Sequence, residues 1–129
     1  MYDSNWYLSL NKPPLSPPSS VFVLVWSVLY ILMFISLGLY ITQDTQKSKI
    51  RGFIYFFIQL FFNAIWSPIF FILQNIGFAL LVVIFLDIFV LMTIKEFYKI
   101  SKISAYLLIP YLIWILFATY LNGAYLYIN

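Results

Sequence analysis

Four long apolar runs divide the chain, and short polar segments separate them. The runs cover about residues 19–43, 52–73, 76–98 and 103–127. Each run is about 20 residues or longer, which is the length that an α-helix needs to cross about 30 Å of hydrocarbon. None of them alternates strictly between apolar and polar residues, so the pattern indicates helices and not strands. The pattern predicts an all-α integral membrane protein, a transmembrane bundle of four spanning helices joined by short connections.

Residues 1–18 do not share this pattern, because they carry Asp3, Lys12 and a group of prolines that ends at Pro17-Pro18. A cleavable signal would need a basic start followed by an apolar run of about 7–15 residues. We therefore expect no signal peptide here, but an extended, proline-rich loop outside the membrane. Proline suits the start of a helix, so the first span is expected to follow directly. The whole chain, 1–129, is predicted to form a single membrane domain.

Six of the seven basic residues flank two of the connections. Those six are Lys47, Lys49, Arg51, Lys95, Lys99 and Lys102, and the seventh, Lys12, lies before the first span. Both connections lie on one side of the membrane if all four helices span, and basic loops remain on the side from which insertion occurs. We expect a multi-pass protein of a bacterial inner membrane or an organelle membrane, with a non-cytoplasmic C-terminus.

The composition narrows the possible chemistry. Hydrophobic residues make up 64% of the chain and charged residues 9%, against about 45–50% and about 25% in soluble proteins. The chain has no Cys and no His, so it lacks a thiol nucleophile, the commonest general base and the commonest haem ligand. It also contains no phosphate-binding glycine loop. We therefore expect no metal site, no required cofactor and no nucleic-acid partner, and the sequence excludes hydrolase and nucleotide-driven pump chemistry.

The second run carries Gln59, Asn63 and Trp66 at i, i+4 and i+7, which places them on one helix face. Amides inside a membrane need hydrogen-bond partners, so this face is expected to point into the bundle. Two interpretations remain open. The residues hold neighbouring helices together, at about 1 kcal/mol per bond, or they line a ligand cavity.

Two further stripes of large side chains follow the helical period. The fourth run carries Trp114, Ala118, Asn122 and Tyr125, with Pro110 at its start, and the first run carries Trp26, Tyr30 and Met33. Such stripes are usually core or membrane-interface residues. The alternative is a site for a flat ligand, because aromatic side chains stack on flat rings.

Asp87 lies in the middle of the third run. An ionisable group at this depth is costly and is a functional candidate by default. A proton relay would need a series of titratable partners, and none is evident. We therefore favour a protonated or hydrogen-bonded carboxyl that packs against a Gln or a Tyr.

Three spaced motifs together resemble a known family. They are Trp6-Tyr7-Leu8-Ser9-Leu10-Asn11-Lys12-Pro13 with Pro17-Pro18, Val25-Trp26 and Leu29-Tyr30; Gln59-Leu60, Asn63, Trp66-Ser67 and Phe70-Phe71; and Pro110-Tyr111, Trp114, Phe117-Ala118-Thr119 and Leu121-Asn122. In this order they resemble the TspO/MBR family of tryptophan-rich sensory proteins and translocator proteins. The likeness runs from Trp6 to Asn122.

The resemblance implies a membrane protein that binds porphyrin or haem, and in some members sterols, between its helices. The implied ligand-binding residues are Trp6, Tyr7, Trp26, Asn63, Trp66, Phe97, Trp114, Ala118, Leu121 and Asn122, with the loop of Trp6 and Tyr7 as a lid. Sensing, sequestration or transfer of the tetrapyrrole are the implied roles, and family members form homodimers. Two alternatives stay open: light-dependent porphyrin degradation, with Trp26 and Trp114 as the catalytic residues, and transport of porphyrins or sterol-like molecules.

The sequence departs from the family in two respects. Family members have five helices, and the first precedes the Trp-Tyr loop at which this chain begins. We expect a late start site, a truncation or a four-helix variant. The sterol motif is also incomplete, because no basic residue follows Leu121 and Tyr125. Lys102, Tyr106 and Leu108 fit the reversed pattern.

Overall fold

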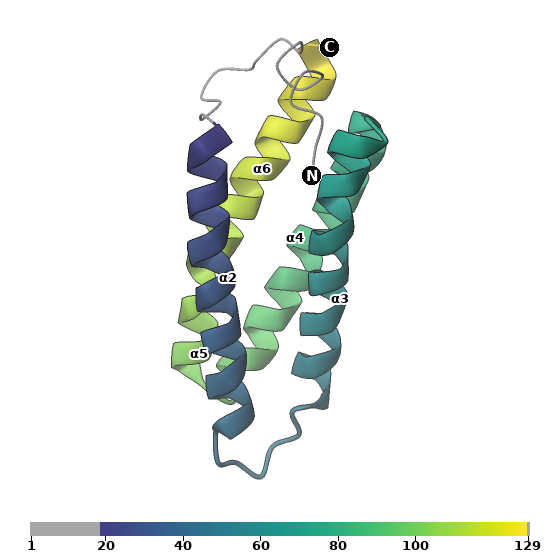
Figure 1. The fold of residues 1–129 in the computed structure, drawn as a ribbon. Coiled ribbons are helices and arrows are strands. Elements are labelled where there is room, and N and C mark those ends of the chain that lie inside the picture. The colour runs from purple at the N-terminus through teal and green to yellow at the C-terminus, as the bar shows by residue number, and fades with distance from the viewer. Residues whose placement is uncertain (1–18, 129) are drawn as a thin grey trace.

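The computed structural model describes residues 19–128, and every element in that range is helical (Figure 1). The elements are α2 (Ser19–Thr42), α3 (Ile50–Ser67), the π-helical turn η1 (Pro68–Ile72), α4 (Ile76–Tyr98), α5 (Lys102–Leu107) and α6 (Ile109–Ile128). Trp6 and Tyr7, the expected lid residues, lie outside the described residues.

Four stretches of this bundle are long and apolar enough to cross a membrane. They are Val23–Thr42, Ile50–Phe70, Ile76–Tyr98 and Lys102–Ile128. Large apolar side chains such as Leu24, Phe61 and Ile113 are exposed on the outside of the bundle, where a bilayer accepts them. The predicted all-helical membrane bundle with four spans is confirmed.

The fourth span is not one continuous helix, although its sequence suggests a single run. A turn at Leu108 separates α5 from α6, and the Leu108 N–H donates to the carbonyl of Ala105 at 3.1 Å. Pro110 explains the interruption, because it has no N–H to donate to the carbonyl of Tyr106 one turn earlier. The second span is also irregular, because its last turn from Pro68 is π-helical: the Leu73 N–H donates to the Pro68 carbonyl at 3.0 Å.

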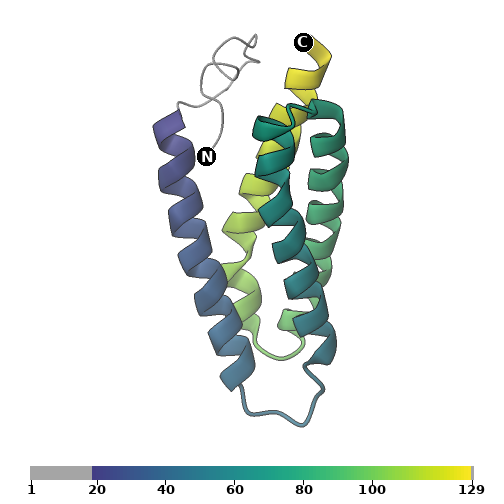
Figure 2. The same cartoon turned by 45° about the vertical axis from the view of Figure 1, so that its right-hand side comes forward.

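The helices pack unevenly. α3 packs along α4, and α4 packs along α6, whereas α2 packs mainly against the short α5. Figure 2 shows the consequence: the N-terminal end of α2 stands apart from the tops of α3 and α6, while its C-terminal end lies close to α5. We call the end of the bundle with the connections 43–49 and 99–101 the basic end, and the other half, with Trp26, Trp66 and Trp114, the tryptophan half.

Two serines fix α2 to α5 towards the basic end. The Ser36 hydroxyl donates to the Ser104 carbonyl at 2.6 Å, and the Ser104 hydroxyl donates to the Ser36 carbonyl at 2.5 Å. Both serines are fully buried. Because serine is small, the two backbones approach closely, as is usual where helices meet in membranes.

Tyr40 continues this contact towards α3 and α4. Its ring stacks on Phe97 with a centroid distance of 4.0 Å and also contacts Gly52, while its hydroxyl donates to the Lys49 carbonyl at 2.8 Å. The Lys47 ammonium donates to the Lys99 carbonyl at 2.9 Å and so joins the two basic connections. The basic end is therefore held together by direct contacts among α2, α3, α4 and α5.

Candidate functional site

The tryptophan half contains a buried hydrogen-bond network that joins α2, α3 and α6. Tyr30 on α2 donates to Asn63 Oδ1, and Asn63 Nδ2 donates to the Tyr111 hydroxyl at 2.7 Å. The Tyr111 hydroxyl donates in turn to Gln59 Oε1 at 2.7 Å, and Gln59 Nε2 faces Met33 Sδ at 3.7 Å. The network thus uses polar side chains from three helices and ends at a thioether.

The spacing of the amides explains why they meet. Gln59 and Asn63 are four residues apart on α3, with 1% and 6% of their surface exposed, so both point into the bundle. A buried amide without a partner costs about 1–3 kcal/mol. The network supplies those partners, and it therefore holds α2, α3 and α6 at a defined separation.

Tyr111 is the central residue of this network, and the sequence interpretation did not single it out. The predicted stripe on the fourth run begins at Pro110 and contains Trp114, Ala118, Asn122 and Tyr125. The buried face of α6 contains Ala118, Asn122 and Tyr125 of that stripe, and it also contains Tyr111, Ile115 and Leu121. Tyr111 precedes Ile115 by four residues and Ala118 by seven, so the helical period contains the signal.

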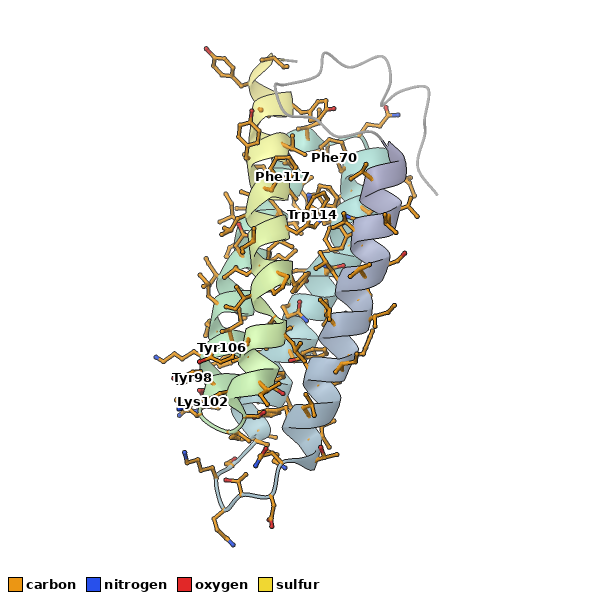
Figure 3. The ribbon with its side chains drawn as sticks, turned by 90° about the vertical axis from the view of Figure 1, so that its left-hand side faces the viewer. Phe70, Tyr98, Lys102, Tyr106, Trp114 and Phe117 are labelled. Atoms are coloured by element: carbon orange, nitrogen blue, oxygen red, sulfur yellow. The ribbon has the colours of Figure 1, made fainter. Side chains whose placement is uncertain are left out.

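Trp26 is the centre of an aromatic group beside the network. Its ring centroid lies 5.9 Å from that of Tyr30, 6.3 Å from that of Tyr111 and 6.4 Å from that of Trp114. The Trp26 and Trp114 rings meet edge to face, at 85°. Figure 3 shows Trp114 in the same part of the bundle as Phe117 and Phe70, and the Phe117 centroid is 5.4 Å from that of Trp114. The structure therefore brings together the two candidate tryptophans from α2 and α6.

Trp66 and Asn122 form a second polar contact, which lies farther from the basic end than the network does. Trp66 Nε1 donates to Asn122 Oδ1 at 2.9 Å, and Asn122 Nδ2 donates to the Ile76 carbonyl at 2.9 Å. These bonds connect α3 through α6 to the first turn of α4. Ala118 and Leu121 are buried on the same side of α6, each with 4% exposed. Five of the candidate residues from α3 and α6 thus lie in one region: Asn63, Trp66, Ala118, Leu121 and Asn122.

Phe97 lies elsewhere. It is fully buried at the basic end, where it stacks on Tyr40 and on Phe56, the latter with a centroid distance of 6.0 Å. The apolar core that contains Phe97 continues to Trp26, Trp66 and Trp114, but its ring contacts are with Tyr40 and Phe56. Sequence reasoning placed it with the tryptophans by resemblance alone, and the structure shows it in a different aromatic group.

Asp87 is buried between α4 and α6, and its partner is a threonine and not the expected Gln or Tyr. Thr119 Oγ1 lies 2.6 Å from Asp87 Oδ2 and 2.8 Å from the Ile115 carbonyl oxygen. The threonine hydroxyl has one hydrogen and can donate only once. Both contacts are hydrogen bonds if a neutral Asp87 carboxyl supplies the second hydrogen, which avoids a charge at this depth.

The donor set of residues 19–128 suits an organic ligand better than a metal ion. No group of three His, Cys, Asp or Glu side chains that could hold a metal occurs in this range. The network instead offers amides, phenols and indoles, which recognise flat aromatic molecules by stacking and hydrogen bonding.

Comparison with known proteins identifies the family of the chain. Residues 1–128 match the sequence profile of the TspO/MBR family. The chain is 42% identical over 127 residues to the "Tryptophan-rich protein TspO" of Archaeoglobus fulgidus, covering 96% of this chain and 80% of that protein. It is 38% identical over 117 residues to the "Tryptophan-rich sensory protein" of Cereibacter sphaeroides (91% and 72%). It is 35% identical over 122 residues to the "Translocator protein" of Homo sapiens (91% and 70%). Since both the profile and these identities extend over most of the chain, it belongs to the TspO/MBR family.

Proposed function

We propose that this protein binds a tetrapyrrole, porphyrin or haem, among α2, α3 and α6 in the tryptophan half. The observation that carries this proposal is the meeting of Trp26 and Trp114 beside the hydrogen-bonded amide of Asn63. A flat ring gains about 0.5–1.5 kcal/mol per aromatic pair beyond the area that it buries. Relatives named as a sensory protein and a translocator protein support a role in sensing, sequestration or transfer.

Binding requires movement, because the aromatic rings already contact one another. A flat ligand needs about 3.5 Å on each face, hence about 7 Å between two facing ring planes. Trp26 and Trp114 meet edge to face at a centroid distance of 6.4 Å. The ligand must therefore replace their mutual contact. α2 is the helix best able to move, because its direct backbone contacts are with α5 at Ser36 and Ser104. We infer that its N-terminal half tilts outward about this serine contact to admit the ring.

The proposed binding mode depends on stacking and polar contacts and not on iron. The chain has no His or Cys, so an axial bond to haem iron would require Tyr or Met. The Met33 sulfur already faces Gln59 Nε2 at 3.7 Å. Iron-free protoporphyrin is therefore expected to bind about as tightly as haem.

Replacement of Asn63 by Leu tests the site. Asn63→Leu removes the amide that joins Tyr30 to Tyr111, and we expect porphyrin affinity to fall by about ten-fold or more, since a lost buried hydrogen bond costs about 1–3 kcal/mol. Affinity is measured per folded molecule by quenching of tryptophan fluorescence. Normal affinity in a less stable variant would instead mean that Asn63 only connects helices.

Light-dependent porphyrin degradation is the second candidate function, and the close contact of Trp26 with Trp114 favours it. The double variant Trp26→Phe/Trp114→Phe keeps two rings for stacking but removes both indoles, the more easily oxidised side chains. We expect porphyrin binding to weaken only a few-fold, while loss of the Soret band under illumination stops. Equal bleaching by parent and variant would exclude a chemical role for these tryptophans.

The orientation in the membrane follows from the basic end. We propose that the connections 43–49 and 99–101 face the cytoplasm, because basic loops are retained there. A reporter that is active only in the cytoplasm is then expected to be silent when it is fused after Asn129. Strong activity of that fusion would reverse the orientation.

A further inference from the structure

Two tyrosines and a lysine gather on the outer face of the bundle where α4 ends and α5 begins. Lys102 Nζ lies 5.7 Å from the centroid of the Tyr98 ring, and the Tyr98 and Tyr106 centroids are 6.2 Å apart. Figure 3 shows these three side chains together on the outside, far from Trp114. Tyr98 and Tyr106 are 46% and 58% exposed. The group therefore faces the surroundings of the bundle and not its core.

A second lysine lies close to this group. Lys95 is exposed and precedes Tyr98 by three residues on α4, which places the two on one face. Glu96 is largely buried and pairs with Lys99 at 2.8 Å. Within residues 19–128, neither Lys95 nor Lys102 forms an ion pair. Two positive charges and two phenol hydroxyls thus face outward together.

An apolar side chain continues this face towards the centre of the membrane. Leu91 precedes Tyr98 by seven residues on α4 and is 52% exposed. Seven residues are two helical turns, so Leu91 lies on the same face of the continuous helix α4 as Tyr98. The surface is therefore cationic and phenolic at the membrane boundary and apolar at the depth of the acyl chains.

We propose that this surface binds one anionic glycerophospholipid, with its phosphate headgroup at Lys102, Lys95, Tyr98 and Tyr106 and its acyl chains along the face of α4 that carries Leu91. Basic residues next to a span attract anionic headgroups, and tyrosine is common where a helix meets the headgroup region. The Lys102 position above the Tyr98 ring limits the freedom of the ammonium group. This site is independent of the proposed tetrapyrrole site, because it lies on the outside of the basic end.

A sterol is the less suitable occupant. The reversed sterol pattern uses Lys102, Tyr106 and Leu108, but Leu108 has only 1% of its surface exposed. Its side chain lies in the core and cannot contact a sterol in the bilayer. The remaining pair, Lys102 and Tyr106, suits the charged headgroup of a phospholipid better than the single uncharged hydroxyl of a sterol.

The test is lipid retention by the full chain, measured by native mass spectrometry in a neutral detergent. Phosphatidylglycerol, phosphatidylcholine, a sterol or inorganic phosphate is added, and the parent is compared with Lys102→Gln. Arg51→Gln is the matched control, because Arg51 is an exposed cation near the other basic connection. We expect the parent to retain one phosphatidylglycerol. Affinity is expected to fall about five-fold in Lys102→Gln, the change for one basic residue at an anionic surface, and to change less than two-fold in Arg51→Gln.

Each other result would overturn the proposal in a defined way. Equal losses in Lys102→Gln and Arg51→Gln would show general surface attraction without a site. Equal retention of phosphatidylcholine would show that charge does not select the lipid, and displacement by a sterol would assign the surface to sterols. Displacement by inorganic phosphate at equal concentration would show that the acyl chains contribute nothing. The Tyr106→Phe variant adds a finer test, because it keeps the ring and the fold but should still weaken retention of phosphatidylglycerol.

Discussion

The two halves of α2 contact the bundle in different ways. At the basic end, Ser36 and Ser104 exchange hydrogen bonds, and the α2 and α5 backbones approach closely. In the tryptophan half, large side chains such as Trp26 and Tyr30 fill the space between α2 and its neighbours. Small residues allow close helix packing in membranes, whereas rings hold the backbones apart. A contact made by rings can be replaced by a contact with another ring. The basic end is therefore suited to holding the fold together, and the tryptophan half is suited to admitting a flat ligand.

Among the changes at the basic end, Phe97→Ala is expected to lower the free energy of unfolding most. The ring of Phe97 stacks on Tyr40 and Phe56 and is fully buried, and truncation of such a ring costs on the order of 3–5 kcal/mol. The free energy of unfolding, measured in mixed detergent micelles, is the readout. Porphyrin affinity per folded molecule should remain within about two-fold of the parent value. A large loss of affinity with little loss of stability would place Phe97 in the ligand site after all.

Gly52→Ala tests the same end with a smaller change. A Cβ at Gly52 would collide with the Tyr40 ring, whose hydroxyl is held by the Lys49 carbonyl. Overpacking of this kind costs about 1–3 kcal/mol. Gly38→Ala is the control, because a Cβ there meets nothing within 4 Å, and alanine is favoured over glycine in a helix by up to about 1 kcal/mol. Equal stability of the two variants would show that Tyr40 is not tightly held.

Asp87→Asn is expected to have the smallest effect. If the buried carboxyl is neutral, an amide of similar shape can also donate to Thr119, and the change should stay below about 1.5 kcal/mol. The melting temperatures of the parent and variant proteins test this directly. A loss of several kcal/mol would mean that a charged carboxylate with an additional partner occupies this position.

Much of the fold can be predicted from the sequence because its signals are local. A span of about 20 apolar residues is determined by the thickness of the membrane, so all four spans were expected. The spacing of Gln59, Asn63 and Trp66 also correctly indicates that one face of α3 points inward. The interruption at Leu108 follows from Pro110. The contact of the resulting short helix α5 with α2 depends on packing between helices and could not be predicted.

The partners within the site could not be predicted, because they come from different helices. No pattern in the third run indicates that Asp87 meets Thr119, or that Tyr111 lies between Asn63 and Gln59. These pairs depend on the rotation and height of each helix in the bundle. Phe97 lies two residues before Lys99, so the sequence places it towards the basic end, but its ring partners Tyr40 and Phe56 come from other helices and could not be predicted.

A pair of distances between spin labels tests the outward movement of α2 most directly. The chain has no Cys, so labels can be attached at Leu24→Cys and Phe78→Cys in the tryptophan half, and at Leu39→Cys and Ile103→Cys near the basic end. All four positions are exposed. On addition of protoporphyrin, we expect the Leu24–Phe78 label distance to lengthen and the Leu39–Ile103 distance to stay the same. If tryptophan fluorescence is quenched while neither distance changes, the porphyrin binds without moving α2, and the proposed outward tilt of its N-terminal half is wrong.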